Sequence, residues 1–198
     1  MRRSSNDRRI VASAVAGIVG PTAFVGAWVT GGLRTPGYSF VGAAISRLAA
    51  VHATTRPLMT GGFVTFGVAL PIFGQALRRE FGPRVAVAAT ISGLATLGVA
   101  AFPLDHSDAV DRAHAAVAFV AYVATSAMPA LAERSLRSSG MNVAANGSAS
   151  IAAASALSLV ASTLGPAHGL FQRTGLTVVD VWMVVVALTL LRGKSTEQ

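Results

Sequence analysis

The chain has 198 residues, of which 53% are apolar and 12% are charged, and its mean hydropathy is +0.59. Soluble globular domains carry about 25% charged residues, so this composition excludes an ordinary water-soluble domain and indicates a protein that lies in lipid. The net charge of +8 would suit nucleic acid in a soluble protein, but membrane topology explains the positions of the cations better, so we expect membrane lipids and no nucleic acid as partners.

Six apolar runs approach the length of about 20 residues that an α-helix needs to cross the hydrocarbon core of a bilayer. They predict an all-α integral membrane bundle of six transmembrane helices, which forms a single transmembrane domain over residues 1–198. The predicted spans are residues 10–29, 58–77, 85–101, 113–132, 149–164 and 170–191. The first run follows basic residues, as in a signal peptide, but it is longer than the apolar core of about 7 to 15 residues that such a peptide has, so we expect an anchor.

The basic residues gather on one side of these spans. Eleven of the sixteen cations fall in the two tails and in the second and fourth connections, namely Arg2, Arg3, Arg8, Arg9, Arg78, Arg79, Arg84, Arg134, Arg137, Arg192 and Lys194. Cytoplasmic loops are enriched in Lys and Arg. We therefore predict that both the N and the C terminus are cytoplasmic and that the chain is a multi-pass protein of the plasma (inner) membrane.

The first connection, residues 31–57, is long. Ser39 can cap a short helix in which Phe40, Ala44, Leu48 and Val51 recur at roughly helical spacing. Three arrangements stay open for this segment: a helix in the membrane interface, a segment that tucks back between the spans, and a solvated loop with one helical turn.

Small residues recur at every fourth position of the fifth span, at Ser150, Ala154, Ser158 and Ser162. In lipid, small residues let two helix backbones approach closely, because no hydrophobic drive holds the helices together. We therefore predict that this stripe faces a neighbouring helix.

The stretch "AFPLDHSDAVDRAHAAVAF", residues 101–119, holds three of the eight acids and two of the four histidines. Asp108, Asp111 and His114 follow one another at intervals of three, so the last two can share a face of a helix. One interpretation is capping, in which Ser107 or Asp108 caps the fourth helix and Asp108 pairs with Arg112.

The other interpretation of this stretch is a functional site. Its polar candidates are Asp105, Asp111 and His114. Imidazole nitrogen and carboxylate oxygen suit zinc, so His106, Asp111 and His114 are candidate metal ligands, although no closed ligand motif is present. The absence of cysteine excludes a thiol catalyst and a cysteine-ligated metal.

In the sixth span, Arg173, Thr177 and Asp180 form one polar stripe with spacings of i, i+4 and i+7. An acid at that depth in lipid is costly without a partner, so Asp180 is a candidate for function, or for a structural hydrogen bond to a neighbouring helix. Polar groups in lipid must find partners. We therefore expect Asp111 and His114 to meet this stripe in one outward-facing polar cavity.

Four short motifs follow one another among the spans: "YSFVGAAISRL", "RPLMTGGFVTFG", "FPLDHSD" with His114 beyond it, and "GLFQR" followed by Trp182. In these motifs the chain resembles the bacterial membrane family called domain of unknown function 998, whose members are six-helix membrane proteins similar in outline to the Frag1/DRAM/Sfk1 proteins associated with lipid anchors and lipid organisation. The resemblance points to Ser46, Arg56, Asp105, His114, Gln172 and Arg173. After Ser46 the family pattern has an acid, whereas this chain has Arg47.

These residues leave three functions open, and they identify no cofactor. A binding protein is the leading expectation: Arg47 and the two arginines of the motifs would hold a lipid headgroup or a small anionic ligand, and the uncharged polar residues would hydrogen-bond it. A membrane-embedded hydrolase would use a carboxylate and a histidine, with or without a metal, against a lipid ester or phosphodiester. A proton-coupled transporter would use Asp180.

Overall fold

The structure is a computed structural model that describes residues 5–193, and within this range it is all-helical, without a strand. The elements are α1 (Ser5–Arg34), the 3-10 helix η1 (Ile45–Ala49), α2 (Arg56–Phe81), α3 (Pro83–Ala101), α4 (Asp108–Ser138), α5 (Asn142–Ala161) and α6 (His168–Gly193). All six α-helices are long and apolar enough to cross a membrane. The predicted fold class is therefore confirmed, and the chain is a multi-pass membrane protein.

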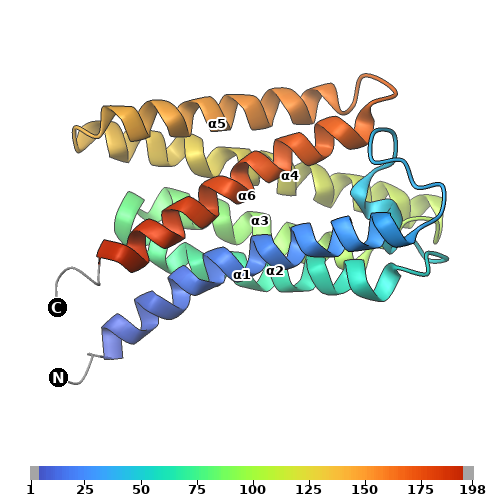
Figure 1. Cartoon of the computed structure of the whole chain (residues 1–198), viewed down its shortest axis with the longest axis horizontal. Coiled ribbons are helices and arrows are strands. Elements are labelled where there is room, and N and C mark those ends of the chain that lie inside the picture. Colours follow the sequence, from blue (N-terminus) through green and yellow to red (C-terminus); the bar gives the residue numbers. More distant parts are fainter. Residues whose placement is uncertain (1–4, 194–198) are drawn as a thin grey trace.

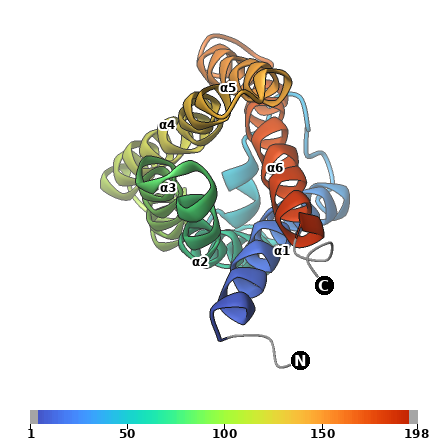
Figure 2. The ribbon, with the colours of Figure 1, turned by 90° about the vertical axis from the view of Figure 1, so that its left-hand side faces the viewer.

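The six helices form a closed ring. Each helix packs against the next one in the chain, and α6 returns to pack against α1 (Figure 2). The first described residue of α1 and the last of α6 lie at the same end of the ring, which we call the tail end (Figure 1). The connections that follow α1, α3 and α5 lie at the opposite end, which we call the cap end (Figure 1).

The cations from which we predicted the topology lie at the tail end, where the structure describes them. Arg2, Arg3 and Lys194 lie outside the described residues, and the other eight belong to the stretches at the tail end. The structure thus places these eight at one end of the bundle, while the cytoplasmic location of that end stays a prediction from the positive-inside rule.

Five of the six predicted spans lie within the observed helices, but the fifth is displaced. We predicted residues 149–164, whereas α5 is Asn142–Ala161. Its first two turns contain polar and glycine residues, which hid them from a search for apolar runs. The helix stops at its C-terminal end where the hydroxyls of Ser162 and Thr163 donate hydrogen bonds of 2.7 and 2.8 Å to the last carbonyls, those of Leu159 and Val160.

The predicted small-residue stripe is not the packed face of α5, since Ser150 and Ala154 are exposed and Ser158 is half-buried, while the buried Ser162 lies just beyond the end of the helix. The packed face instead contains Ala145, Ser148, Ala152, Ser155 and Leu159. Two hydrogen bonds select it, from Trp182 Nε1 to Ser148 Oγ at 3.1 Å and between the hydroxyls of Ser126 and Ser155 at 2.8 Å. A helix with small residues on every side packs through whichever side finds polar partners.

The first connection enters the cap end of the ring. The helix expected from Ser39 is absent: the Ser39 Oγ accepts a 2.9 Å hydrogen bond from the Gly42 N–H and forms a single turn. The chain then forms η1, which packs against α1, α2 and α6 and buries Ile45, Ser46, Leu48 and Ala49. Figure 2 shows this segment lying across the far end of the ring.

Candidate functional site

The cap end is held together by hydrogen bonds between residues 38–45 and the first turns of α6. Leu170 N–H donates to the Val41 carbonyl at 2.9 Å. The Arg173 guanidinium donates through Nη1 to the carbonyls of Phe40 and Ala43, both at 2.9 Å. Gly169 permits this contact, because a Cβ there would overlap the Ala43 carbonyl oxygen. The motifs "YSFVGAAISRL" and "GLFQR" are therefore each other's partners.

Arg173 is a buried structural cation in this arrangement. Its guanidinium carbon lies 5.3 Å from the Trp28 ring centroid, 5.4 Å from that of Tyr38 and 5.3 Å from that of Phe40. It also donates a hydrogen bond to the Tyr38 hydroxyl. Burial raises the pKa of the Tyr38 phenol, an effect that Arg173 opposes, so the phenol stays protonated at neutral pH. Cation–π contacts and carbonyls thus satisfy a charge that sequence reasoning had assigned to a ligand.

Gln172 joins three parts of the chain. Its Oε1 accepts a 2.8 Å hydrogen bond from the Ile45 N–H at the start of η1, and its Nε2 donates to the Tyr122 hydroxyl on α4. Sequence reasoning did not single out Tyr122. The available signal was that it is one of only two tyrosines in the chain and lies in an apolar span, where its hydroxyl needs a partner.

The "FPLDHSD" stretch is joined to η1 and to α4. Arg47 forms an exposed 2.7 Å ion pair with Asp105, whose backbone has φ +64°. The Asp105 N–H donates to the Asp111 carboxylate at 3.0 Å. Ser107 is the N-cap of α4 and accepts from the Val110 N–H at 3.4 Å. Asp111 thus stabilises the connection from within the first turn of α4, which agrees with the capping interpretation.

His114 is buried, and its position fixes which ring nitrogen can act. Its Nδ1 lies 2.7 Å from the Phe102 carbonyl oxygen, which can only accept, so Nδ1 carries a proton. In the neutral ring Nε2 is then an acceptor. This nitrogen forms no hydrogen bond with the residues that the structure describes.

A central cavity of about 40 Å³ lies beneath η1, inside the ring. Its lining is Phe24, Ile45, Ser46, Phe63, Phe66, Thr96, Val99, His114, Ala118, Ala121, Tyr122, Thr125, Gln172 and Leu176. Both threonine hydroxyls of the lining already form hydrogen bonds. Thr96 donates to the Ser92 carbonyl within α3 at 2.8 Å, and Thr125 on α4 bonds the Ser92 hydroxyl on α3 at 2.6 Å. Among the polar side chains of the lining, those of Ser46 and His114 are the ones with an Oγ or Nε2 that forms no hydrogen bond with the described residues.

The structure brings Ser46, His114 and Gln172 together, but it separates them from other candidates. Arg173 and Asp180 do not line this cavity, which is therefore not the one that we expected His114 to share with the α6 stripe. From α6, Gln172 and Leu176 line the cavity; they are four residues apart and share one face of the helix. Arg56 lies outside the lining, half-buried at the start of α2.

Asp180 is buried, with 3% of its surface exposed. Its Oδ2 has no hydrogen-bond partner, and neither has the buried Arg173 Nε or Trp28 Nε1. Neither Arg173 nor His114, the ionisable residues nearest to it in the expected polar cavity, bonds to Asp180, since the hydrogen bonds of both are made to backbone carbonyls and, for Arg173, to Tyr38.

The metal candidates do not converge. Among residues 5–193, no three His, Asp or Glu side chains are placed to hold a metal ion. His106 is exposed in the connection, Asp111 accepts from a backbone N–H, and the Nδ1 of His114 is bonded to a carbonyl.

No curated protein and no solved structure matches this chain. A family described as "Protein of unknown function (DUF998)" matches residues 18–189, which include α2 to α5 and most of α1 and α6. The match also contains the cap motifs and every residue of the cavity lining. The chain therefore belongs to the DUF998 family of membrane proteins.

Proposed function

We propose that this membrane protein binds the hydrogen-bonding head of an amphipathic ligand in the central cavity. The observation that carries the proposal is that, in a mostly apolar lining, His114 Nε2 and Ser46 Oγ form no hydrogen bond with the described residues, whereas the other polar side chains of the lining do. One can accept and the other can donate, which together suit a hydroxyl group or, through Ser46, a carbonyl oxygen. Binding sites for small molecules combine apolar walls with a few placed polar groups in this way.

The absence of charged side chains from the cavity lining favours a ligand with a neutral head group. The sequence had suggested an anionic ligand instead. The lining contains no Arg, Lys, Asp or Glu. Arg173 is held by carbonyls and Arg47, which belongs to η1, pairs with Asp105, so both of these cations already have partners within the protein. A volume of about 40 Å³ holds roughly two or three water molecules, which matches a hydroxyl or carbonyl group with its first carbon atoms.

The test measures thermal unfolding of the purified protein in detergent with increasing monoacylglycerol, which has hydroxyl and ester groups on an apolar chain. A ligand that binds only the folded state raises the unfolding temperature as its concentration rises. We expect this rise in the unchanged protein, and its loss in His114→Phe and Ser46→Ala. His106→Phe is the matched control, because His106 is exposed at the same end and does not line the cavity. An equal rise in all four proteins would contradict the proposal.

A second candidate function is supported by the same two side chains. Ser46 and His114 line one cavity, and the His114 Nδ1 is fixed by a carbonyl so that Nε2 is the acceptor, as a general base for a serine nucleophile requires. The protein would then hydrolyse an ester of such an amphiphile. Labelling by a fluorophosphonate that is lost in Ser46→Ala and in His114→Phe would favour hydrolysis. Unlabelled protein that still responds to monoacylglycerol would favour binding alone.

A further inference from the structure

A second hollow lies on the outside of the ring, between α3 and α4. It has a volume of about 360 Å³ and is separate from the central cavity. Its lining is Arg84, Val87, Ala88, Ile91, Phe119, Val120, Val123, Ala124, Ala127 and Leu131. Alanines form part of its floor, whereas its larger side chains are exposed; Phe119, for example, is 67% exposed. We call this hollow the α3–α4 groove.

The groove has the length of one leaflet. Along α4 it extends from Phe119 to Leu131, which are twelve residues apart, or about 18 Å of helix. The hydrocarbon core of a bilayer is about 30 Å thick, so one leaflet contributes about 15 Å. A single acyl chain that enters from the tail end would therefore lie in the groove over its whole depth.

Two arginines stand at the tail end of the groove. Arg84 belongs to its lining, and Arg134 lies one turn beyond Leu131 on the same face of α4. Both are exposed, and neither forms a hydrogen bond or ion pair with the residues that the structure describes. An apolar channel that ends at two unpaired cations is complementary to a molecule with an apolar chain and an anionic head.

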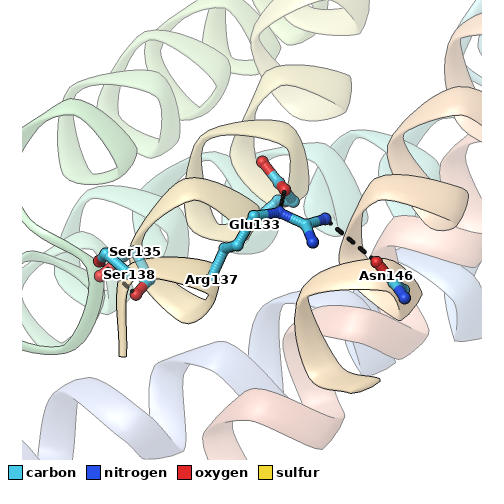
Figure 3. Close-up of polar contacts among 5 residues, drawn as sticks. All are labelled: Glu133, Ser135, Arg137, Ser138 and Asn146. Atoms are coloured by element: carbon cyan, nitrogen blue, oxygen red, sulfur yellow. Dashed lines mark hydrogen bonds and ion pairs between the residues drawn. The ribbon is translucent and has the colours of Figure 1, made fainter. Parts of the chain in front are cut away.

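A neighbouring arginine shows that the tail end can satisfy its charges when packing requires it. Arg137 donates through Nε to Glu133 at 2.5 Å and through Nη2 to Asn146 Oδ1 at 3.0 Å, which joins α4 to α5 (Figure 3). Arg134, three residues earlier in α4, has no such partner among residues 5–193. Its charge is available to a group outside the protein.

We infer that the α3–α4 groove binds an anionic phospholipid of the leaflet at the tail end, with one acyl chain along the groove and the phosphate at Arg84 and Arg134. Guanidinium groups bind phosphate oxygens through paired N–H donors, and cations near the membrane surface favour anionic lipid. This site is distinct from the central cavity, so it stands or falls separately from the proposed function.

Native mass spectrometry of the full chain tests the inference directly. The protein in detergent is given equal amounts of phosphatidylglycerol and phosphatidylcholine with identical chains, and the ratio of the two bound lipids is measured. We expect phosphatidylglycerol to predominate. Each arginine near the surface contributes about a fivefold preference, so Arg84→Gln should lower the ratio about fivefold and the pair Arg84→Gln with Arg134→Gln further.

Two further variants separate the groove from general charge. Arg192→Gln removes one exposed cation from the tail end of α6, across the ring from the groove, and should leave the ratio within twofold (Figure 2). Val123→Trp fills the groove without changing charge and should reduce the number of bound lipids of both kinds. The positions are exposed, so all variants should unfold at nearly the same temperature as the unchanged protein.

Three results would overturn the inference. The first is an unchanged lipid ratio after loss of both groove arginines, and the second is an equal fall in Arg192→Gln. The third is a dimer mass that Val123→Trp abolishes, which would mean that a second copy of the chain, and not a lipid, occupies the groove.

Discussion

The two ends of the ring use arginine in opposite ways. At the cap end, Arg173 is buried under three aromatic rings and bonded to two carbonyls, and Arg47 is paired with Asp105. At the tail end, Arg84 and Arg134 are exposed and unbonded within the described chain. A charge inside the bundle needs protein partners because lipid offers none, whereas a charge at the surface meets water and headgroups. Arg173 and Arg47 at the cap end therefore serve structure, whereas Arg84 and Arg134 at the tail end are available to groups of the membrane.

The largest expected difference between the two ends is their accessibility to a reagent outside the cell: one end should be labelled and the other should not. The chain has no cysteine, so Ser107→Cys at the cap end and Ser139→Cys at the tail end are each a unique label site. If the cap end faces outward, a membrane-impermeant thiol reagent should label position 107 in intact cells, and position 139 only after the inner face is opened. Labelling of both from outside would contradict the predicted topology.

Replacing Arg173 should have the largest effect on stability. Arg173→Leu leaves the Phe40 and Ala43 carbonyls without their donor and should lower the free energy of unfolding by about 2 to 4 kcal/mol. Arg84→Gln at the tail end should change it by less than about 0.5 kcal/mol, as surface substitutions do. Thermal unfolding in detergent measures both. Equal effects would mean that the two ends do not differ as we describe.

A glycine pair tests the close contact at the cap. In Gly169→Ala the new Cβ meets the Ala43 carbonyl, so residues 38–45 must shift, and we expect a loss of about 1 to 3 kcal/mol. Gly61→Ala, in the first turns of α2, meets nothing within 4 Å and should stabilise the helix by up to about 1 kcal/mol. Opposite signs in the same unfolding assay are expected, and a neutral Gly169→Ala would show that the cap tolerates displacement.

Replacing Asp180 should have a smaller effect on stability, and we expect the replacement to stabilise the protein. The sequence suggested a structural hydrogen bond for Asp180, but its Oδ2 has no partner among the described residues. An unpaired buried carboxyl is costly, so Asp180→Leu should raise stability by about 1 kcal/mol, with Asp180→Asn nearer to neutral. A large loss in Asp180→Leu, measured by thermal unfolding, would reveal a partner that the described chain does not contain.

The smallest effect belongs to the exposed pair of Arg47 and Asp105, whose side chains are 53% and 45% exposed. A double-mutant cycle with Arg47→Gln and Asp105→Asn should give a coupling of at most about 1 kcal/mol, because water and salt screen the pair. The coupling should fall further as salt is raised. A larger coupling free energy that does not depend on salt would mean that this pair is as well shielded from water as the buried contacts of the cap end.

The sequence by itself determined that six helices cross a membrane, where five of them lie, and which residues share each end. These properties depend on the apolar content of single runs and on the even alternation of connections, so they can be obtained without knowing any contact. Recognition of the cap motifs also located Ser46, His114 and Gln172, which the structure brings to one cavity.

Only the tertiary structure decided which polar group meets which. Arg173 bonds to Ala43, 130 positions earlier, and Gln172 reaches both η1 and α4, while Asp180, on the same helix, has an oxygen without a partner. The face that α5 packs and the 3-10 form of η1 were settled in the same way. In lipid, any polar group gains by finding a donor or acceptor, and the choice among several candidates depends on the distances that the closed ring imposes.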